Sequence, residues 1–340
     1  MRDRCQLLGR AGATIVRPVQ TRESRIGPWL VALGAGLWGT ESAWRIPLNK
    51  LFPDADVIVW WEHVILVACA LPFVAPRLHE LARVRWQTVA WLVFSGIAGS
   101  AVGTIFFTLA LKYGNPTVVN VVLNVQPLLS TMAAIAIFRD RIGPMFLPWA
   151  ALAIVAGMVL VGLGPGFEID VDRGTGYALI CALFWGLSTV AGRGVMVEMS
   201  LPLASGLRVV VGLVTMTIIL GVRGLLRPDT LWPAGARLDS ATTAVWLLLL
   251  AIVSGGIPLV VYFAGLARTR ASTAGYFEMM QTLVAVSITW IFFGYALAWW
   301  QWIAGSVLIA AVAMVQRAGA RHGVSCAASE STRERSAPAG

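Results

Sequence analysis

The chain has 340 residues, of which 58% are hydrophobic and only 13% are charged. About a quarter of the residues of a soluble domain are charged, so this composition excludes an ordinary soluble protein and indicates an integral membrane protein. The formal net charge is +9, but the arginines lie singly between apolar runs, which is typical of membrane topology signals and not of a nucleic-acid-binding surface. The four cysteines show neither metal-binding spacing nor close pairing.

The chain begins with a basic segment and continues as a series of apolar runs. Residues 1–27 carry six arginines and predict a disordered cytoplasmic arm, whereas the small, polar and charged residues 317–340 predict a disordered cytoplasmic tail. Because a transmembrane helix needs about 20 apolar residues, the runs between them predict ten membrane-spanning helices and leave no separate soluble domain. The predicted spans are 29–47, 57–76, 87–111, 116–138, 146–164, 174–196, 201–221, 243–267, 271–293 and 299–316.

The lysines and arginines indicate how these spans are oriented. With the N-terminus inside, 18 of them fall on the inner side and 7 on the outer side, while Arg208 lies within a span. Cytoplasmic segments carry an excess of these residues. We therefore expect a multi-pass protein of the inner (plasma) membrane with both termini in the cytoplasm.

The second half of the chain repeats the first. Trp38-Gly39 recurs as Trp185-Gly186 after 147 residues, and Gln126 recurs as Gln281 after 155 residues. An odd number of predicted spans, five, separates the copies, so the two halves would lie upside down relative to each other. The predicted fold is an all-α integral membrane protein with ten transmembrane helices in two inverted-topology five-helix repeats, 28–165 and 172–316.

Several short motifs resemble those of a known family. They are Leu37-Trp38-Gly39 and Phe184-Trp185-Gly186 at the start of each half, Leu109 to Tyr113, Gln126-Pro127, Phe138 to Ile142, Gly157 to Leu160, and the stretch from Leu201-Pro202 to Arg208. In their order and spacing the chain resembles the drug/metabolite transporter superfamily, of the type with two tandem EamA domains. The resemblance implies a secondary transporter, working as an exporter of a small metabolite, an amino acid or a drug-like amphiphile. The chain departs from the family pattern at Gln281-Thr282, where a Glu-Pro pair is usual, and at Tyr295, where an acidic residue is usual.

Charged side chains inside the predicted spans of the first half are candidates for a substrate or coupling site. Glu41 lies one helical turn before Arg45, either as an interfacial ion pair or as a proton-accepting carboxylate at the mouth of a cavity. Glu62 and His63 follow two tryptophans and lie up to two turns inside the membrane. His63 is either a packing residue or, beside Glu62, part of a proton relay.

The second half contributes an arginine and an isolated glutamate. Arg208 takes the place in the seventh span that Glu62 takes in the second. Either the two face each other across the pseudo-twofold axis, or Arg208 holds an anionic group of the substrate; the alternative is an arginine that snorkels to the inner surface. Glu278 is the first choice for a coupling site because an unpaired buried carboxylate is costly, against the alternative of a group hydrogen-bonded in a helix interface.

Uncharged polar groups cluster around the predicted fourth span. Asn120 and Asn124 share a helix face, and Pro127, next to Gln126, deprives the Leu123 carbonyl of its helical partner. The set either exposes backbone polar groups to a cavity or joins helices. Gln281, the copy of Gln126, and Tyr262 in the eighth span complete the candidate set.

Two further patterns have structural interpretations. Trp38 and Trp185 lie inside spans, where they either line an aromatic pocket or pack between helices. Gly96, Gly99 and Gly103 give the third span a smooth face, which predicts close helix packing.

The sequence contains no Ser/His/Asp order, phosphate loop or zinc spacing, so we expect no enzyme, no cofactor and no metal. The expected partners are the lipid bilayer, a small-molecule substrate and protons, without nucleic acid. The predicted function is proton-coupled secondary transport by alternating access. The alternatives are an uncoupled facilitator or exchanger and a non-transporting membrane factor.

Overall fold

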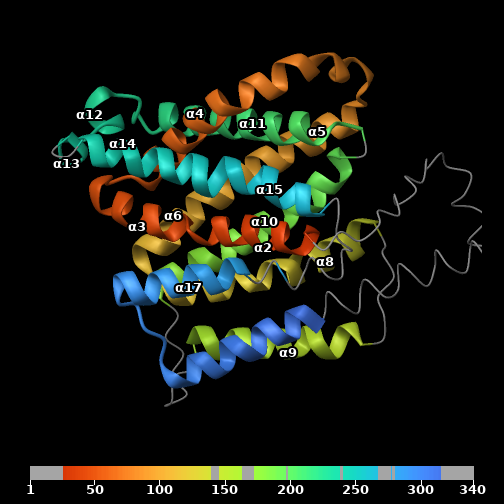
Figure 1. Ribbon diagram of the computed structural model, residues 1–340, viewed down its shortest axis with the longest axis vertical. Helices are drawn as coiled ribbons and strands as arrows, with labels where there is room; N and C mark the ends of the chain where they lie inside the picture. Colours follow the sequence, from red (N-terminus) through yellow and green to blue (C-terminus); the bar gives the residue numbers. More distant parts are fainter. Residues whose placement is uncertain are drawn as a thin grey trace, which may run out of the picture.

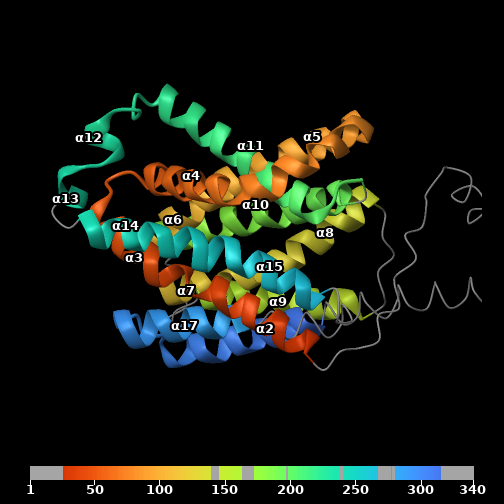
Figure 2. The same ribbon diagram turned by 45° about the horizontal axis from the view of Figure 1, so that its top comes forward.

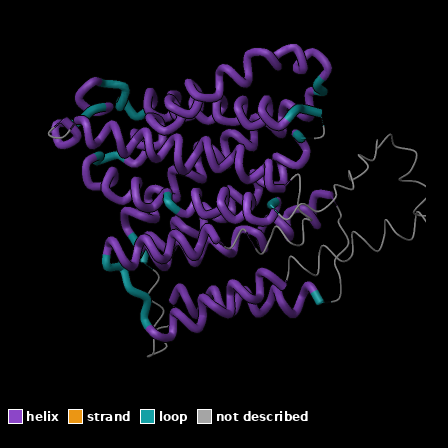
Figure 3. The backbone as a smooth tube through the Cα atoms, in the orientation of Figure 1, coloured by secondary structure: helices purple, strands orange, loops and turns teal. Residues whose placement is uncertain are grey.

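The computed structural model describes residues 26–138, 145–162, 172–196, 198–237, 240–266, 277 and 280–314. In these residues the secondary structure is helical and contains no strand (Figure 3). The predicted all-α class is confirmed for this part of the chain. Glu278 and almost all of the predicted terminal arm and tail lie outside the described residues.

The helical segments follow the predicted spans along the chain. The first half forms α2 (Gly27–Gly39), α3 (Glu41–Leu51), α4 (Ala55–Val74), η1 (Ala75–Arg83), α5 (Trp86–Ser95), η2 (Gly96–Gly103), α6 (Thr104–Tyr113), α7 (Pro116–Val122), η3 (Leu123–Val125), α8 (Gln126–Phe138) and α9 (Phe146–Gly162). The second half forms α10 (Arg173–Val195), α11 (Leu201–Val222), α12 (Pro228–Leu231), α13 (Ala234–Arg237), α14 (Ser240–Leu248), η4 (Leu249–Gly256), α15 (Ile257–Leu266), α17 (Met280–Phe293) and a last helix, Trp299–Met314.

Long apolar helices make this a multi-pass membrane protein. Within the described residues, five stretches are long and apolar enough to cross a membrane by length and composition: Ala55–Arg83, Trp86–Tyr113, Arg173–Gly192, Leu201–Val222 and Ser240–Tyr262. Large apolar side chains remain exposed on the outer faces of these and neighbouring helices, including Ile218, Val222 and Phe292. Such surfaces suit contact with lipid, where the helix satisfies its own backbone hydrogen bonds.

Local sequence features explain where several helices begin or break. The predicted span 29–47 is divided at Thr40, whose hydroxyl donates to the Leu37 carbonyl at 2.7 Å. Asn115 caps α7, because its Oδ1 accepts from the Thr117 N–H at 2.9 Å. In the fourth span, the Leu123 carbonyl does not lose its partner as expected, since the Gln126 N–H donates to it in a short 3₁₀ turn.

Each half contains a π-helical segment at the same place. η2 and η4 are both eight residues long and interrupt the third span of their repeat. Such π-bulges are rare and occur frequently at functional sites. The glycines of η2 pack closely on α10 and α11, where an added Cβ at Gly99 would lie 2.1 Å from the Ser188 hydroxyl oxygen. The predicted close packing of this glycine face is therefore confirmed.

Within one bundle, the first helix of each half packs against helices of the other half (Figures 1 and 2). α2 packs against α15 and α17 of the second half, and its repeat copy α10 packs against α6 and α8 of the first half. The second helices of the repeats, α4 and α11, pack against each other. α9 and the helix Trp299–Met314 lie side by side along one side of the bundle (Figure 1). Helices at equivalent positions in the two sequence repeats therefore make equivalent contacts.

Repeated glycines permit the close approach of these exchanged helices. An added Cβ at Gly39 would lie 2.5 Å from the Gln281 carbonyl oxygen, and one at Gly186 would lie 3.3 Å from the Gln126 carbonyl oxygen. In each repeat, a glycine of the first helix thus contacts the backbone of a glutamine in the other repeat, and the two glycine–glutamine pairs occupy equivalent positions in the repeats. The spacing that relates the residues in sequence relates their contacts in space.

We expect Gly39→Ala to destabilise the protein by about 1–3 kcal/mol, because the new methyl group overpacks the α2–α17 contact against backbone atoms. Unfolding of the detergent-purified protein would measure the change. The matched control is Gly176→Ala on α10, where an added Cβ meets nothing within 4 Å. Helix propensity favours alanine at both sites by up to about 1 kcal/mol, so equal stability changes in the two variants would contradict the packing role of Gly39.

Candidate functional site

Three ionisable side chains meet where α3, α4 and α6 pack together: Arg45 and Glu62 are buried, and Glu41 is partly buried. Arg45 on α3 has no exposed surface, and its Nη2 pairs with Glu41 on the same helix and with Glu62 Oε2 on α4 at 2.8 Å. Its Nη1 donates to Thr108 Oγ1 on α6 at 2.7 Å. The guanidinium carbon lies 5.5 Å from the centre of the Phe107 ring, within range of a cation–π contact. We call Glu41, Arg45 and Glu62 the Arg45 cluster.

The charges of the Arg45 cluster do not balance. Two carboxylates share one guanidinium, so the cluster has a formal charge of −1 when all three groups are ionised. Arg45 Nε also has no hydrogen-bond partner among the described residues. Because a net buried charge is costly, this arrangement is suited to binding and releasing one proton.

Polar side chains of neighbouring helices hold the Arg45 cluster in place. Thr108 Oγ1 donates to the Thr104 carbonyl at 2.8 Å, which directs its lone pairs toward Arg45. Asn49 Nδ2 donates to the Thr108 carbonyl at 3.0 Å. Asn120 Nδ2 on α7 donates to Ser42 Oγ on α3 at 3.0 Å. These bonds fix the rotation of α3 against α6 and α7.

His63 faces a different neighbour from Glu62. Its Nδ1 donates to the Val59 carbonyl on the preceding turn at 2.8 Å. Its ring packs on α11, where an added Cβ at Gly212 would lie 2.7 Å from His63 Cδ2. His63 is therefore buried at the α4–α11 contact, within electrostatic range of both Arg45 and Arg208, while Glu62 joins the Arg45 cluster.

The amide side chains of the fourth span lie at the contact between the repeats. Thr282 Oγ1 on α17 donates to Asn124 Oδ1 at 3.0 Å, and Asn124 Nδ2 donates to the Val121 carbonyl at 2.9 Å. Gln126 and Gln281 present their backbone carbonyls to Gly186 and Gly39. Asn124 therefore joins the fourth span to α17 through its side chain, whereas Gln126 and Gln281 contribute backbone carbonyls to these contacts.

Two aromatic pairs repeat across the halves. Trp38 on α2 contacts Tyr262 on α15 with ring centres 4.9 Å apart and planes at 49°. Trp185 on α10 contacts Phe107 on α6 at 5.3 Å and 47°. Trp185 Nε1 also donates to the Gly99 carbonyl in η2 at 3.0 Å. The two tryptophans therefore pack between helices at repeat-related positions.

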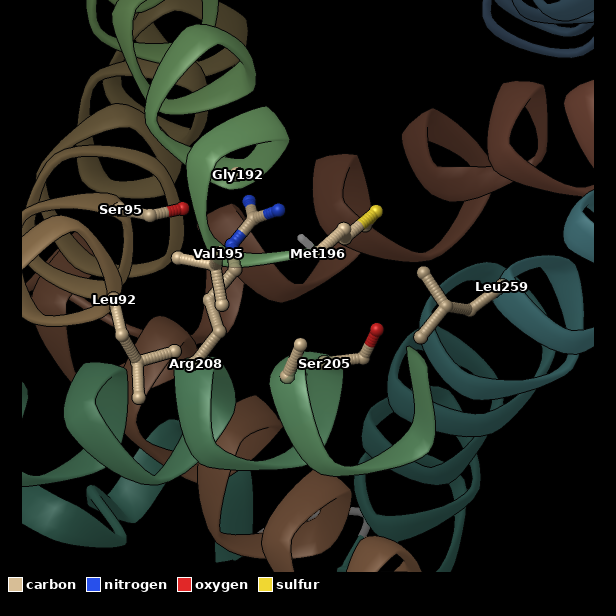
Figure 4. Close-up of a pocket in the computed structure, with 9 residues that line it drawn as sticks. Leu92, Ser95, Gly192, Val195, Met196, Ser205, Arg208 and Leu259 are labelled. Carbon is tan, nitrogen blue, oxygen red and sulfur yellow. The ribbon is translucent and has the colours of Figure 1, made fainter. Parts of the chain in front are cut away.

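Arg208 stands apart from the Arg45 cluster. It lies seven residues into α11, and its Nε donates to Ser100 Oγ at 3.1 Å. Glu62 pairs with Arg45 and not with Arg208, so the hypothesis that Glu62 and Arg208 face each other is wrong. Figure 4 shows the Arg208 side chain extending from α11 toward Gly192 on α10, at a cavity of about 50 Å³.

Sequence reasoning missed the central position of Arg45. It counted Arg45 among the outer-side residues, because the predicted first span ended at residue 47, and it considered the pair with Glu41 either as an interfacial ion pair or as part of a cavity mouth. The signal that was present is the i,i+4 spacing from Glu41, together with a second buried glutamate after a short turn. Thr108 and Ser42 could not be found, because single hydroxyl groups in apolar helices have no distinctive pattern.

Comparison with family models identifies both halves of the chain. The EamA-like transporter family matches at residues 25–163 and again at 172–317. These matches cover most of the sequence, and the chain belongs to the EamA-like transporter family, whose members are transporters and not enzymes. The resemblance to drug/metabolite transporters with two EamA domains is thereby confirmed.

Individual relatives are more distant. The riboflavin transporter ImpX of Fusobacterium nucleatum subsp. nucleatum is 22% identical over 196 residues, which cover 54% of this chain and 63% of that protein. An uncharacterized transporter of Haemophilus influenzae is 26% identical over 125 residues, covering 36% of this chain and 38% of that protein. The matches thus span less than two thirds of the length of these curated relatives. A solved crystal structure with 21% identity covers 88% of this chain and 99% of its own, with a TM-score of 0.53, and supports the fold alone.

Proposed function

We propose that this protein is a secondary active transporter that exports a small metabolite by alternating access and is coupled to protons. Ten transmembrane helices would form two inverted repeats, 28–165 and 172–316, that rock about a shared centre. The exchanged contacts of α2 with α15 and α17, and of α10 with α6 and α8, support this arrangement.

The observation that carries the proposal is the unequal state of two repeat-related sites. The Arg45 cluster is filled by its own ion pairs, and Trp61, next to Glu62, donates to the Leu231 carbonyl of α12 at 2.9 Å. Arg208 lies beside a cavity, and His63, next to Glu62, is within electrostatic range of both Arg45 and Arg208. A symmetric architecture with one site closed and the other open is what a carrier shows at one extreme of its cycle.

The orientation follows from the excess of basic residues on the predicted inner side. With both termini in the cytoplasm of an inner (plasma) membrane, the Arg45 cluster would close the outer end and the Arg208 cavity would open inward. Opening the outer end would separate Arg45 from one or both carboxylates. A proton taken up at Glu41 or Glu62 would then replace the lost guanidinium. Glu278, outside the described residues, stays a second coupling candidate.

The substrate is proposed only by class, as a small metabolite, an amino acid or a drug-like amphiphile. Riboflavin, the compound named for the Fusobacterium relative, belongs in any screen as one candidate among these. The oligomeric state is left open by this mechanism, because each chain carries both repeats.

Transport by the purified full chain in liposomes tests the proposal. A panel of amino acids, carboxylates, amphiphilic drugs and riboflavin would be tested with and without an imposed pH gradient, against protein-free liposomes. We expect at least one compound to accumulate against its gradient only when protons flow in the opposite direction. Flux that ignores the pH gradient would instead establish an uncoupled facilitator, and absence of flux for every compound would favour a non-transporting membrane factor.

A further inference from the structure

The repeat relates the Arg45 cluster to the surroundings of Arg208. At the spacing of 147 residues that joins Trp38 to Trp185, Arg45 corresponds to Gly192 and Glu41 corresponds to Ser188. Glu62 corresponds to Arg208 at a spacing of 146 residues. The second half therefore has a cation where the first has an acid, and lacks side-chain charge at the other two places.

The Arg208 guanidinium has unused hydrogen-bonding capacity. Nε bonds to Ser100, and the Nη2 atom lies beside Gly99, where an added Cβ would approach it to 2.8 Å. Among the described residues, no carboxylate lies within ion-pairing distance of this group. A guanidinium has five N–H donors in a planar fork, and four of them have no partner in the part of the chain that the structure describes.

The cavity beside Arg208 has the size and lining of a site for a small anionic group. It lies between α5, α10, α11 and α15, with Ser95 and Ser205 as further polar lining and apolar side chains elsewhere (Figure 4). A water molecule needs about 10–15 Å³ by this measure, so about 50 Å³ accommodates a carboxylate but not a whole metabolite. Gly192 keeps the space open because it has no side chain. The repeat-related position in the first half is filled by the side chain of Arg45.

We propose that the cavity beside Arg208 binds the carboxylate of the transported substrate, so that the protein selects small carboxylic acids or amino acids over neutral analogues. The guanidinium would bind both oxygens of the acid in parallel. In the first half, Glu41 and Glu62 supply the carboxylates that the substrate supplies in the second. This inference rests on the proposed transport function for its physiological meaning, but binding itself can be measured without transport.

The test is ligand binding to the purified full chain, followed as the shift in unfolding temperature with ligand concentration. The probes are carboxylic acids paired with their primary amides, including benzoate with benzamide and phenylalanine with phenylalaninamide. We expect at least one acid to bind more tightly than its amide. Arg208→Gln should weaken binding of that acid roughly 10- to 100-fold, the range for a hydrogen bond to a charged group, with partial recovery in Arg208→Lys.

A second variant keeps the inference testable if Arg208→Gln fails to fold. Gly192→Val would fill the cavity while leaving Arg208 in place, and Gly176→Val on the same helix is its matched control; at both glycines an added Cβ meets nothing within 4 Å. We expect only Gly192→Val to weaken acid binding. Acids that bind no better than their amides, or equal losses in the two valine variants, would overturn the proposal.

Two outcomes separate this inference from the transport proposal. Acid binding that depends on Arg208, without flux in liposomes, would leave the site standing and remove the transport function. Flux of a neutral compound that is unchanged in Arg208→Gln would remove the site and leave the transport function. If Glu278→Gln raised acid affinity more than about tenfold, the chain's own carboxylate would be the occupant, which also overturns the proposal.

Discussion

Replacing Arg45 with glutamine is expected to lower the free energy of unfolding by about 3–5 kcal/mol, because it leaves the buried Glu62 and the partly buried Glu41 without their cation. Arg45 has no exposed surface and bonds to α3, α4 and α6 at once. Solvent screening therefore cannot replace the lost contacts. Unfolding of the purified variant in detergent, beside the wild-type protein, would measure the change.

A second variant separates the effect of the unpaired carboxylates on stability from the effect of lost side-chain packing. The triple variant Glu41→Gln, Arg45→Gln and Glu62→Gln has no buried charge left in the cluster, and we expect it to recover a large part of the stability that Arg45→Gln loses. Arg85→Gln is the control for a surface pair. The Arg85 side chain is 71% exposed where it pairs with Glu198, so its loss should change stability by no more than about 1 kcal/mol. A triple variant as unstable as Arg45→Gln would show that shape, and not charge, dominates at this position.

The sequence predicted the repeat because identical residue pairs recur at a constant spacing. Trp38-Gly39 and Trp185-Gly186 marked equivalent positions, and the structure gives both pairs equivalent contacts. What the spacing could not predict is which helix each pair would touch. A repeat in the sequence indicates that two residues have similar surroundings, but it does not indicate which helices form those surroundings. That α2 packs against the second half and α10 against the first is seen only in the folded bundle.

The charged residues show a similar limit. Glu41, Glu62 and Arg208 were selected because charge inside a span is costly, and each lies in a helix of the bundle. The sequence could not predict that Glu62 pairs with Arg45, because this pair depends on the turn between α3 and α4, which brings Glu62 back onto Arg45. The π-helical segments η2 and η4 were also unforeseen, since a shift from i→i+4 to i→i+5 bonding leaves no regular trace in apolar side chains.

Glu62→Gln is expected to abolish accumulation driven by a pH gradient while leaving exchange down the substrate gradient. In the wild-type protein, closing the cluster around Arg45 brings together two carboxylates and one guanidinium. With glutamine at position 62 the cluster is neutral without a proton, so the conformational change no longer requires one. An exchange of one proton per substrate across a gradient of one pH unit sustains about tenfold accumulation, and this ratio should fall to about one in the variant.

Three variants locate the coupling step more closely. Glu41→Gln should have the same effect as Glu62→Gln, because either carboxylate can carry the proton that balances Arg45. Glu198→Gln is the matched control, since this carboxylate pairs with Arg85 in the turn before α11, far from the cluster in the chain. Glu278→Gln tests the other candidate in the same assay. Full accumulation in both cluster variants would refute coupling at Arg45. Loss of accumulation in Glu278→Gln alone would place the proton on the ninth span. The group that carries the proton must be a carboxylate whose removal uncouples flux from the pH gradient without stopping exchange.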